Sequence, residues 1–303
     1  MYLQHFRLKE FPFGITPDTS FFFSSTASQQ ALNTLLVATR AGEGFIKITG
    51  EVGTGKTLLC RQLLLSVGGD FQTAYIPNPY LTPMGLLLEL AEELGADTSV
   101  LRQVAEIQQQ HLLLKSLRLR LLDLALENKR VLVCLDEVQA MPIETLEALR
   151  LLTNLETEKR KLVQVVIFGQ PELDEKLNHP SIRQLKQRIT FDHHLGPLTG
   201  PELARYVAHR MSVAGYDGPR LFSTPALWVL KWRTRGFPRL VNIAAHKALL
   251  CSYGRGKKSV GLREMDEAID DTASLRIGLP SLVWASLAVA GLGWLVVQLA
   301  STV

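Results

Sequence analysis

Cysteine is scarce and scattered in this chain of 303 residues. Three occur, too few for the disulfide framework of a small secreted domain or for a zinc knuckle. Net charge is also small: 33 Lys and Arg against 29 Asp and Glu leave +4, which by itself indicates no nucleic-acid partner. Hydrophobic residues at 47% and charged residues at 20% exclude a disordered chain. We therefore expect one large or two modest soluble domains in a reducing compartment.

The two ends of the chain differ in charge. Residues 1–10 carry charge where a secretory signal needs its apolar core, so no export signal is expected. Residues 277–303 lack Asp, Glu, Lys and Arg, and residues 279–299 would form a helix of roughly 31 Å, enough to cross a bilayer. A buried core helix is the alternative. Basic residues precede this stretch and none follows it, which predicts a single-pass inner-membrane protein whose folded part faces the cytoplasm.

A glycine-rich loop lies between a predicted strand and a predicted helix. Residues 45–49 alternate like a short strand, residues 58–64 begin a helix, and the sequence GEVGTGKT between them matches the phosphate-loop pattern in full. We expect Lys56 to reach the β- and γ-phosphates of ATP and the Thr57 hydroxyl to ligate Mg²⁺. A glycine-rich turn that binds nothing is the alternative, which the strand–loop–helix context disfavours. The predicted nucleotide contacts of this loop are Gly50, Glu51, Val52, Gly53, Thr54, Gly55, Lys56, Thr57 and Leu58.

A second motif supplies the acidic half of a nucleotide hydrolase. Residues 131–135 form a continuous apolar run, as expected of a buried parallel strand, and Asp136 and Glu137 follow directly. Asp136 is predicted to hold Mg²⁺, and Glu137 to orient and polarise the attacking water. The adjacent glutamate favours ATP hydrolysis over nucleotide binding alone.

The rest of the chain is predicted to alternate strands with helices and then to become purely helical. This order predicts an α/β fold with a parallel sheet covered on both faces, followed by a smaller helical domain. The further predicted strands are residues 73–76, 162–168 and 189–191; the predicted helices are 84–94, 104–126 and 143–159, and residues 198–274 are helical without a strand. The basic run at residues 159–161 is interpreted as a solvated turn, with contact to an acidic partner as the alternative.

Taken together, several short segments resemble one group of ATPases. They are residues 2–6, 11–13, 50–57, 135–137, 149–156, 168–173 and 236–242. Through them the chain is similar, over residues 1 to about 275, to AAA+ ATPases of the general secretion pathway protein A (ExeA) group, which includes ATPases of MSHA pilus biogenesis. The resemblance implies an N-terminal segment on the adenine side (1–42), a P-loop AAA+ core (43–196) and a helical lid domain (197–275), besides the transmembrane helix predicted over 279–299.

The resemblance also implies roles for residues outside the two motifs. Phe11, Pro12 and Phe13 would pack against adenine, with a hydrophobic clasp at the domain edge as the alternative. Gln170 occupies the position of a residue that senses the γ-phosphate, where many members carry Asn, Ser or Thr. Arg239 would contact the γ-phosphate from the lid, with a structural arginine at a helix start as the alternative.

A neighbouring subunit would supply an arginine finger, for which the resemblance offers two candidates. Arg188 is favoured slightly over Arg183. Because a finger supplied in trans stabilises the transition state, hydrolysis would require assembly, and a homo-oligomeric, hexameric ring is expected.

These observations predict a membrane-anchored cytoplasmic AAA+ ATPase that uses ATP and Mg²⁺ to assist assembly of a type IV (MSHA-like) pilus or secretion apparatus. Its expected partners are further copies of itself, inner-membrane pilus or secretion assembly proteins and the membrane, and no nucleic acid is expected. One alternative is a DNA-dependent AAA+ ATPase of the transposition-helper type. Another is a nucleotide-gated scaffold that does not hydrolyse ATP.

Overall fold

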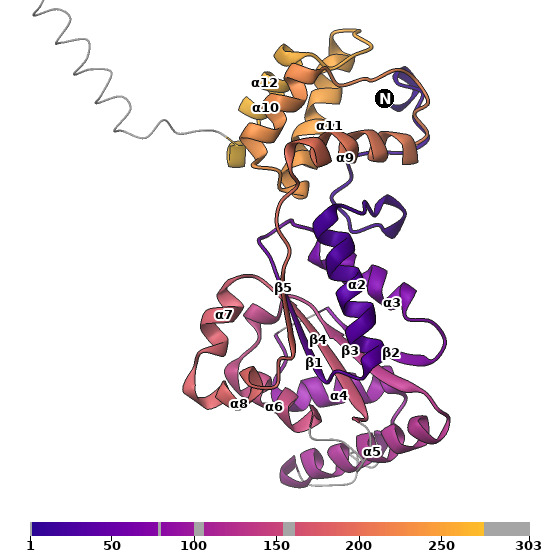
Figure 1. The fold of residues 1–303 in the computed structure, drawn as a ribbon, viewed down its shortest axis with the longest axis vertical. Coiled ribbons are helices and arrows are strands. Elements are labelled where there is room, and N and C mark those ends of the chain that lie inside the picture. The colour runs from indigo at the N-terminus through magenta and orange to yellow at the C-terminus, as the bar shows by residue number, and fades with distance from the viewer. Residues whose placement is uncertain (1, 78–79, 100–105, 154–160, 276–303) are drawn as a thin grey trace, which may run out of the picture.

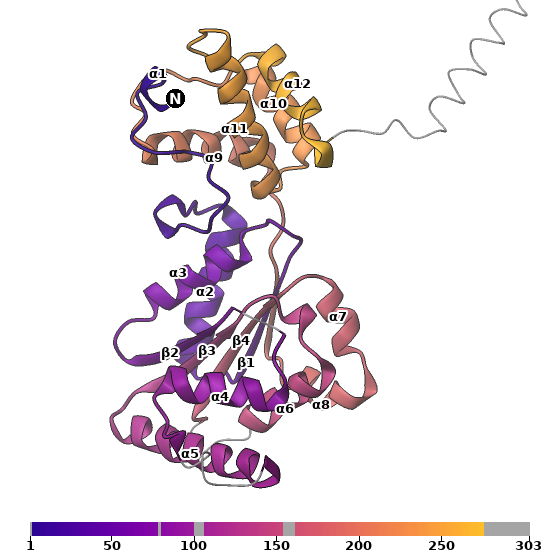
Figure 2. The same cartoon turned by 180° about the vertical axis from the view of Figure 1, so that it is seen from behind.

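A five-stranded sheet with helices on both faces forms the larger part of the molecule (Figures 1 and 2). The computed structural model describes residues 2–77, 80–99, 106–153 and 161–275. The strand order is β2-β3-β4-β1-β5, and all neighbouring pairs are parallel. The predicted parallel sheet is thereby confirmed. The strands are β1 (Phe45–Thr49), β2 (Phe71–Ile76), β3 (Arg130–Leu135), β4 (Val163–Gly169) and β5 (Phe191–His194).

The apolar strands separate two hydrophobic cores, because successive side chains of a strand point to opposite faces. In β4, Val163, Val165 and Ile167 belong to the core beneath the helices α4, α5 and α6. Val166 and Phe168 belong to the other core, beneath α2 and α3. Both faces are covered, which is why β4 is fully buried. The helices of this domain are α2 (Thr26–Ala41), α3 (Lys56–Ser66), α4 (Pro83–Leu94), α5 (Glu106–Leu126), α6 (Ile143–Thr153), α7 (Glu172–Leu177) and α8 (Arg183–Lys186).

The fifth strand differs from its prediction. It is predicted at residues 189–191, but it occupies Phe191–His194 and pairs with β1 from Ile46 onward. β5 is an edge strand whose side chains alternate between half-buried and exposed. An apolar run therefore does not mark its extent, and the two histidines that end it can continue the ladder.

Local signals in the sequence explain where the core helices begin and end. The Ser25 hydroxyl accepts a hydrogen bond from the Ser28 N–H at 3.1 Å and begins α2, and the Thr82 hydroxyl begins α4 in the same way. Both helices end at a glycine in the left-handed region, Gly42 and Gly95. The absence of a Cβ lets glycine adopt that conformation without steric cost.

Four helices form a lid domain beyond the carboxyl ends of the strands (Figure 1). They are α9 (Gly200–Val213), α10 (Thr224–Thr234), α11 (Pro238–Gly254) and α12 (Leu262–Asp270). The first residues of the chain, which include α1 (Tyr2–His5), share the lid's core: Tyr2, Phe6, Leu8 and Phe13 are buried among lid residues. The N-terminal segment thus packs on the lid, whereas α2 packs on the sheet.

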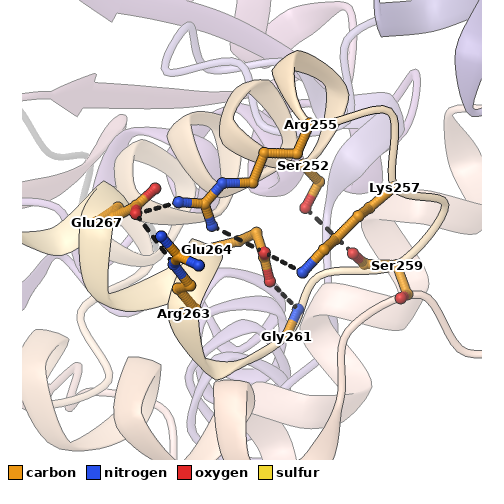
Figure 3. A network of polar contacts seen from close by, with 8 residues as sticks. All are labelled: Ser252, Arg255, Lys257, Ser259, Gly261, Arg263, Glu264 and Glu267. Atoms are coloured by element: carbon orange, nitrogen blue, oxygen red, sulfur yellow. Dashed lines mark hydrogen bonds and ion pairs between the residues drawn. The ribbon is translucent and has the colours of Figure 1, made fainter.

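A network of charged side chains joins α12 to the end of α11 (Figure 3). Glu264 is buried and accepts hydrogen bonds from Lys257 Nζ at 2.7 Å, Arg255 Nη1 at 2.9 Å and the Gly261 N–H at 3.0 Å. The hydrogen bond from Lys257, with those from Arg255 and the main chain, lowers the pKa of Glu264 to about 2. Arg255 also pairs with Glu267. This network therefore fixes the turn between the two helices.

The expected membrane span needs correction. Among the described residues, none of the helices combines the length and the apolar character that crossing a bilayer requires. α5 has 21 residues but carries Lys115, Arg118, Arg120 and Asp123. The helix predicted over 279–299 lies outside the described residues. The predicted localisation as a single-pass inner-membrane protein is therefore corrected: the fold as described comprises a sheet domain and a lid.

Candidate nucleotide-binding and hydrolysis site

The glycine-rich loop connects the end of β1 at Thr49 to the start of α3 at Lys56. Gly53 has φ +81° and Gly55 has φ +102°, a region that side chains with a Cβ rarely adopt. The loop is also enclosed: a Cβ on Gly50 would lie 2.7 Å from the Leu195 carbonyl oxygen. These glycines let the main chain curve around the space where a phosphate would lie, and the start of α3 adds its positive potential there.

Lys56 lies inside this curve and is only 4% exposed. Its Nζ donates to the carbonyl oxygens of Gly50 at 2.7 Å and Glu51 at 3.1 Å. Burial lowers the pKa of Lys56, and the nearby carboxylates of Glu137 and Asp136 oppose that shift. The ammonium group is thus placed within the loop, where it can exchange carbonyl partners for phosphate oxygens.

The two predicted metal ligands lie in direct contact. The Thr57 hydroxyl donates to Asp136 Oδ2 at 2.5 Å, and Asp136 Oδ1 accepts the Glu137 N–H at 2.9 Å. Burial raises the pKa of Asp136, and these two hydrogen bonds oppose the shift. A carboxylate and a hydroxyl are oxygen donors of the kind that Mg²⁺ prefers. The pair therefore fits a magnesium ion bound together with phosphate oxygens.

Glu137 is held by two glutamine side chains. Its Oε2 accepts hydrogen bonds from Gln139 Nε2 at 2.6 Å and Gln170 Nε2 at 2.9 Å. Burial raises the pKa of Glu137, but these hydrogen bonds and the charge of Lys56 lower it more, so the net pKa is below its ordinary value. Glu137 also has φ +52°, a sparsely populated conformation that recurs at functional sites. The result is an ionised, oriented carboxylate.

The strand order explains why these residues meet. Asp136 and Glu137 follow β3, Gln170 follows β4, and the loop follows β1; these three strands are neighbours in the sheet. Gln139 was missed by the sequence analysis. Its side-chain Oε1 accepts the Gln170 N–H at 3.0 Å, so it links the segments after β3 and β4. In the sequence, the feature that could have indicated its role is its position two residues after Glu137.

The lid contacts the loop through the first turn of α11. The main-chain N–H of Arg239 donates to the Gly53 carbonyl oxygen at 3.1 Å, and a Cβ on Gly53 would lie 2.4 Å from the Arg239 Cβ. Gly236 permits the tight turn before α11: it has φ +87°, and a Cβ there would lie 2.2 Å from the Leu198 carbonyl oxygen. The exposed Arg239 side chain therefore starts at the edge of the loop.

A cavity of about 280 Å³ lies between the loop, the lid and the N-terminal segment. Its lining includes Lys56, Thr57, Glu137 and Arg239, together with residues 14–18. Phe11, Pro12 and Phe13 are not among the described residues that line it. Phe13 is buried in the lid against Phe222, and Phe11 contacts the Tyr2 and His246 rings. The adenine contact stays a prediction for Phe11, Pro12 and Phe13, and the geometry favours the five residues that follow them.

Three lid residues in this lining were missed by the sequence analysis: Tyr206, Arg210 and Asn242. Arg210 Nη2 and Asn242 Nδ2 donate to the Gly14 carbonyl oxygen at 3.3 and 3.2 Å. The Tyr206 hydroxyl donates to Asn242 Oδ1 at 2.8 Å. Together they attach the lining segment to α9 and α11. Tyr206 and Arg210 carried no local signal, whereas Asn242 lies in the segment 236–242 on which the resemblance depends.

The two candidate arginine fingers lie away from this cavity. Arg183 begins α8 and is exposed, and half-buried Arg188 follows that helix. Two residues later, the Thr190 N–H donates to the Phe45 carbonyl oxygen at 3.0 Å, at the amino-terminal start of β1. Both arginines thus approach β5 at the end of the sheet opposite the loop. Their role stays a prediction.

Both the sequence and the fold of this chain are similar to those of known proteins. Residues 39–177 match the family described as "AAA domain". General secretion pathway protein A of Aeromonas hydrophila is 39% identical over 279 residues, which are 91% of this chain and 49% of that protein. The chain thus spans about half the length of this curated relative.

Solved structures of low sequence identity share the fold. Cdc6p of Pyrobaculum aerophilum has a TM-score of 0.64 at 18% identity, covering 88% of this chain and 73% of that one. ORC2 of Aeropyrum pernix, solved with ADPNP and ADP, has a TM-score of 0.61 at 19% identity, covering 86% and 73%. RuvB of Thermotoga maritima has a TM-score of 0.55 at 14% identity, covering 86% and 73%.

Proposed function

Because this chain belongs to the AAA+ ATPases related to general secretion pathway protein A, we propose that it hydrolyses ATP to assist assembly of a type IV (MSHA-like) pilus or a secretion apparatus. The observation that supports hydrolysis is the position of the Glu137 carboxylate. Two glutamines orient it beside the cavity that Lys56 and Thr57 line. A site that only bound nucleotide would not need an oriented carboxylate there.

Each side chain has a distinct part in the proposed reaction. Lys56 and the loop N–H groups bind the β- and γ-phosphates, and Thr57 and Asp136 hold Mg²⁺. When bound, Mg²⁺ neutralises charge on the phosphate oxygens. Glu137 accepts a hydrogen bond from the attacking water and orients it toward the γ-phosphorus. Gln139 and Gln170 keep the Glu137 carboxylate in place.

The proposal includes assembly of several copies, as a hexameric ring. Arg183 and Arg188 are not among the described residues that line the cavity of their own chain, which supports a role for one of them at a neighbour's site. Such a residue would stabilise the charge on the transferred phosphoryl group and make turnover depend on protein concentration. Arg188→Ala should then lower turnover and leave ATP binding intact, with Arg183→Ala as the matched comparison.

Two substitutions test hydrolysis. Lys56→Ala should weaken ATP binding. Glu137→Gln should lose at least 100-fold in turnover and retain bound ATP, because Gln cannot accept the proton but preserves the shape of the site. A Glu137→Gln protein with unchanged turnover, or a wild-type protein without affinity for ATP and Mg²⁺, would overturn the proposal. A non-hydrolysing scaffold would show turnover near zero in both proteins.

The proposed role in assembly needs a cellular test. Replacement of the native copy by Glu137→Gln, at an equal protein level, should abolish pilus display or secretion, and whichever is lost identifies the machine. Co-purification should recover pilus or secretion assembly proteins. DNA-stimulated turnover that falls with salt would instead favour the DNA-dependent alternative.

A further inference from the structure

A second cavity lies at the end of the sheet opposite the glycine-rich loop, where β3 and β4 begin. Its volume is about 570 Å³, and its walls come from the ends of α2 and α5 and the starts of the two strands. The described residues that line it include no Asp or Glu. Four of them are basic: Arg40, Lys129, Arg130 and Lys161. Figures 1 and 2 show this end of the sheet far from the lid.

Gln164 lines this cavity with a side chain that is 4% exposed, and its Oε1 is buried without a hydrogen-bond partner. Its neighbours on β4, Val163 and Val165, are apolar, as a strand covered on both faces requires. A buried acceptor without a partner is destabilising, and a native structure with one calls for an explanation. A ligand that donates an N–H or O–H to Gln164 would remove that cost.

Two of the basic residues that line the cavity, Arg130 and Lys161, also contact neighbouring residues. Arg130 Nη1 donates to the Arg40 carbonyl oxygen at 2.6 Å, and its guanidinium lies 5.8 Å from the Phe71 ring centre. The Lys161 side chain lies against Gly44, where a Cβ would be 2.8 Å from the Lys161 Cδ. Among the described residues, one of the four cations forms an ion pair: Lys129 lies 3.5 Å from Glu127. The cavity therefore keeps a net positive charge.

The chemistry of the walls defines the ligand. It must bring anionic oxygens for the basic residues and a hydrogen-bond donor for Gln164. We propose that this cavity binds an acidic segment of a partner protein, whose side-chain carboxylates meet the arginines and lysines and whose main-chain N–H meets Gln164. A nucleic-acid strand fits less well, since no aromatic side chain for base stacking is among the described residues that line the cavity.

The test uses the full chain and a fluorescein-labelled peptide of alternating Glu and Gly, followed by fluorescence anisotropy. Lys161→Glu and Arg40→Glu should each weaken peptide binding at least 10-fold. Lys258→Glu makes the same charge change on the lid surface and should stay within 2-fold. Gln164→Leu should weaken binding several-fold without lowering the melting temperature, because it also removes a buried unpaired acceptor. ATP turnover should be unchanged in all four variants, which also shows that they fold.

Three results would overturn the proposal. If Lys258→Glu and Lys161→Glu weakened peptide binding equally, the peptide would be attracted only by the net charge of the protein. Inorganic phosphate that displaces the peptide at an equal concentration would assign the cavity to a small anion. A ten-nucleotide single-stranded DNA that binds more tightly than the peptide, with the same dependence on Lys161, would assign it to nucleic acid. Because ATP turnover is measured separately, failure here leaves the proposed ATPase function unaffected.

Discussion

The main-chain N–H of Arg239 donates to the carbonyl oxygen of Gly53 at 3.1 Å, so the first turn of lid helix α11 rests on the glycine-rich loop. The contact joins two segments that are nearly 190 positions apart in the sequence and requires that Gly53 have no side chain. A change in the loop on nucleotide binding would therefore reach the lid directly.

Two loop glycines give a matched test of this contact. Gly53→Ala and Gly55→Ala both place alanine at a positive φ, but only the Cβ at residue 53 would meet Arg239, and none of the described atoms lies within 4 Å of a Cβ at residue 55. Gly55→Ala should cost about 1 kcal/mol of backbone strain, and Gly53→Ala a further 1–3 kcal/mol, roughly, from overpacking. Urea unfolding without nucleotide measures both, and equal losses would contradict a close lid contact.

ATP turnover should persist well into mildly acidic solution, because the Glu137 carboxylate stays ionised there. Its hydrogen bonds to Gln170 and Gln139, together with Lys56, outweigh burial and hold its pKa below the ordinary value of 4.5, so the carboxylate stays ionised as the pH falls toward that value. In Gln139→Leu, loss of one donor should raise the pKa of Glu137, so that turnover begins to fall at higher pH. Turnover at pH 7.5 should fall roughly 10- to 100-fold, with ATP affinity little changed. If turnover fell at the same pH in Gln139→Leu as in the wild type, this role for Gln139 would be ruled out.

The lid should lose stability in acid through Glu264. Its hydrogen bonds to Lys257 and Arg255 lower its folded-state pKa to about 2, against an ordinary value of 4.5. The contribution is complete above pH 4.5 and disappears as the pH falls toward 2, and it is about 3 kcal/mol. The difference in unfolding free energy between wild type and Glu264→Gln should therefore shrink across this range. A constant difference would show that the charge of Glu264 is not responsible.

A buried lysine on β1 gives an asymmetric prediction. Lys47, with 6% of its side chain exposed, pairs with Asp174 of α7 and lies 2.8 Å from Asp192 of β5, and these aspartates are 48% and 57% exposed. Lys47→Met leaves carboxylates that water can solvate and should cost about 1 kcal/mol. Asp174→Asn combined with Asp192→Asn leaves a buried ammonium without its carboxylates and should cost about 3 kcal/mol or more. Urea denaturation measures the loss of unfolding free energy in both variants. A larger loss in Lys47→Met than in the double variant would contradict the assigned burial of Lys47.

Predictions from local sequence succeeded where the physical cause is local. The glycine spacing of residues 50–57 and the apolar run before Asp136 depend on neighbours in the chain. The first forms the loop before α3, and the second forms strand β3 of the parallel sheet. The edge strand β5 was misplaced because half of its side chains face solvent. Gln139 went unnoticed because its role depends on Gln170, which reaches it only after β3 and β4 pair.

The sequence by itself determined a parallel sheet, a phosphate loop and an acidic pair, because backbone conformation and hydrophobic periodicity act over a few residues. Only the tertiary structure decided that residues 14–18 line the cavity instead of Phe11, Pro12 and Phe13, because Phe13 is buried against Phe222 of the lid and Phe11 contacts the rings of Tyr2 and His246. It likewise decided that the basic residues at the starts of β3 and β4 line the same cavity as Gln164. Such contacts arise from strand order and lid packing, which no short stretch of sequence encodes.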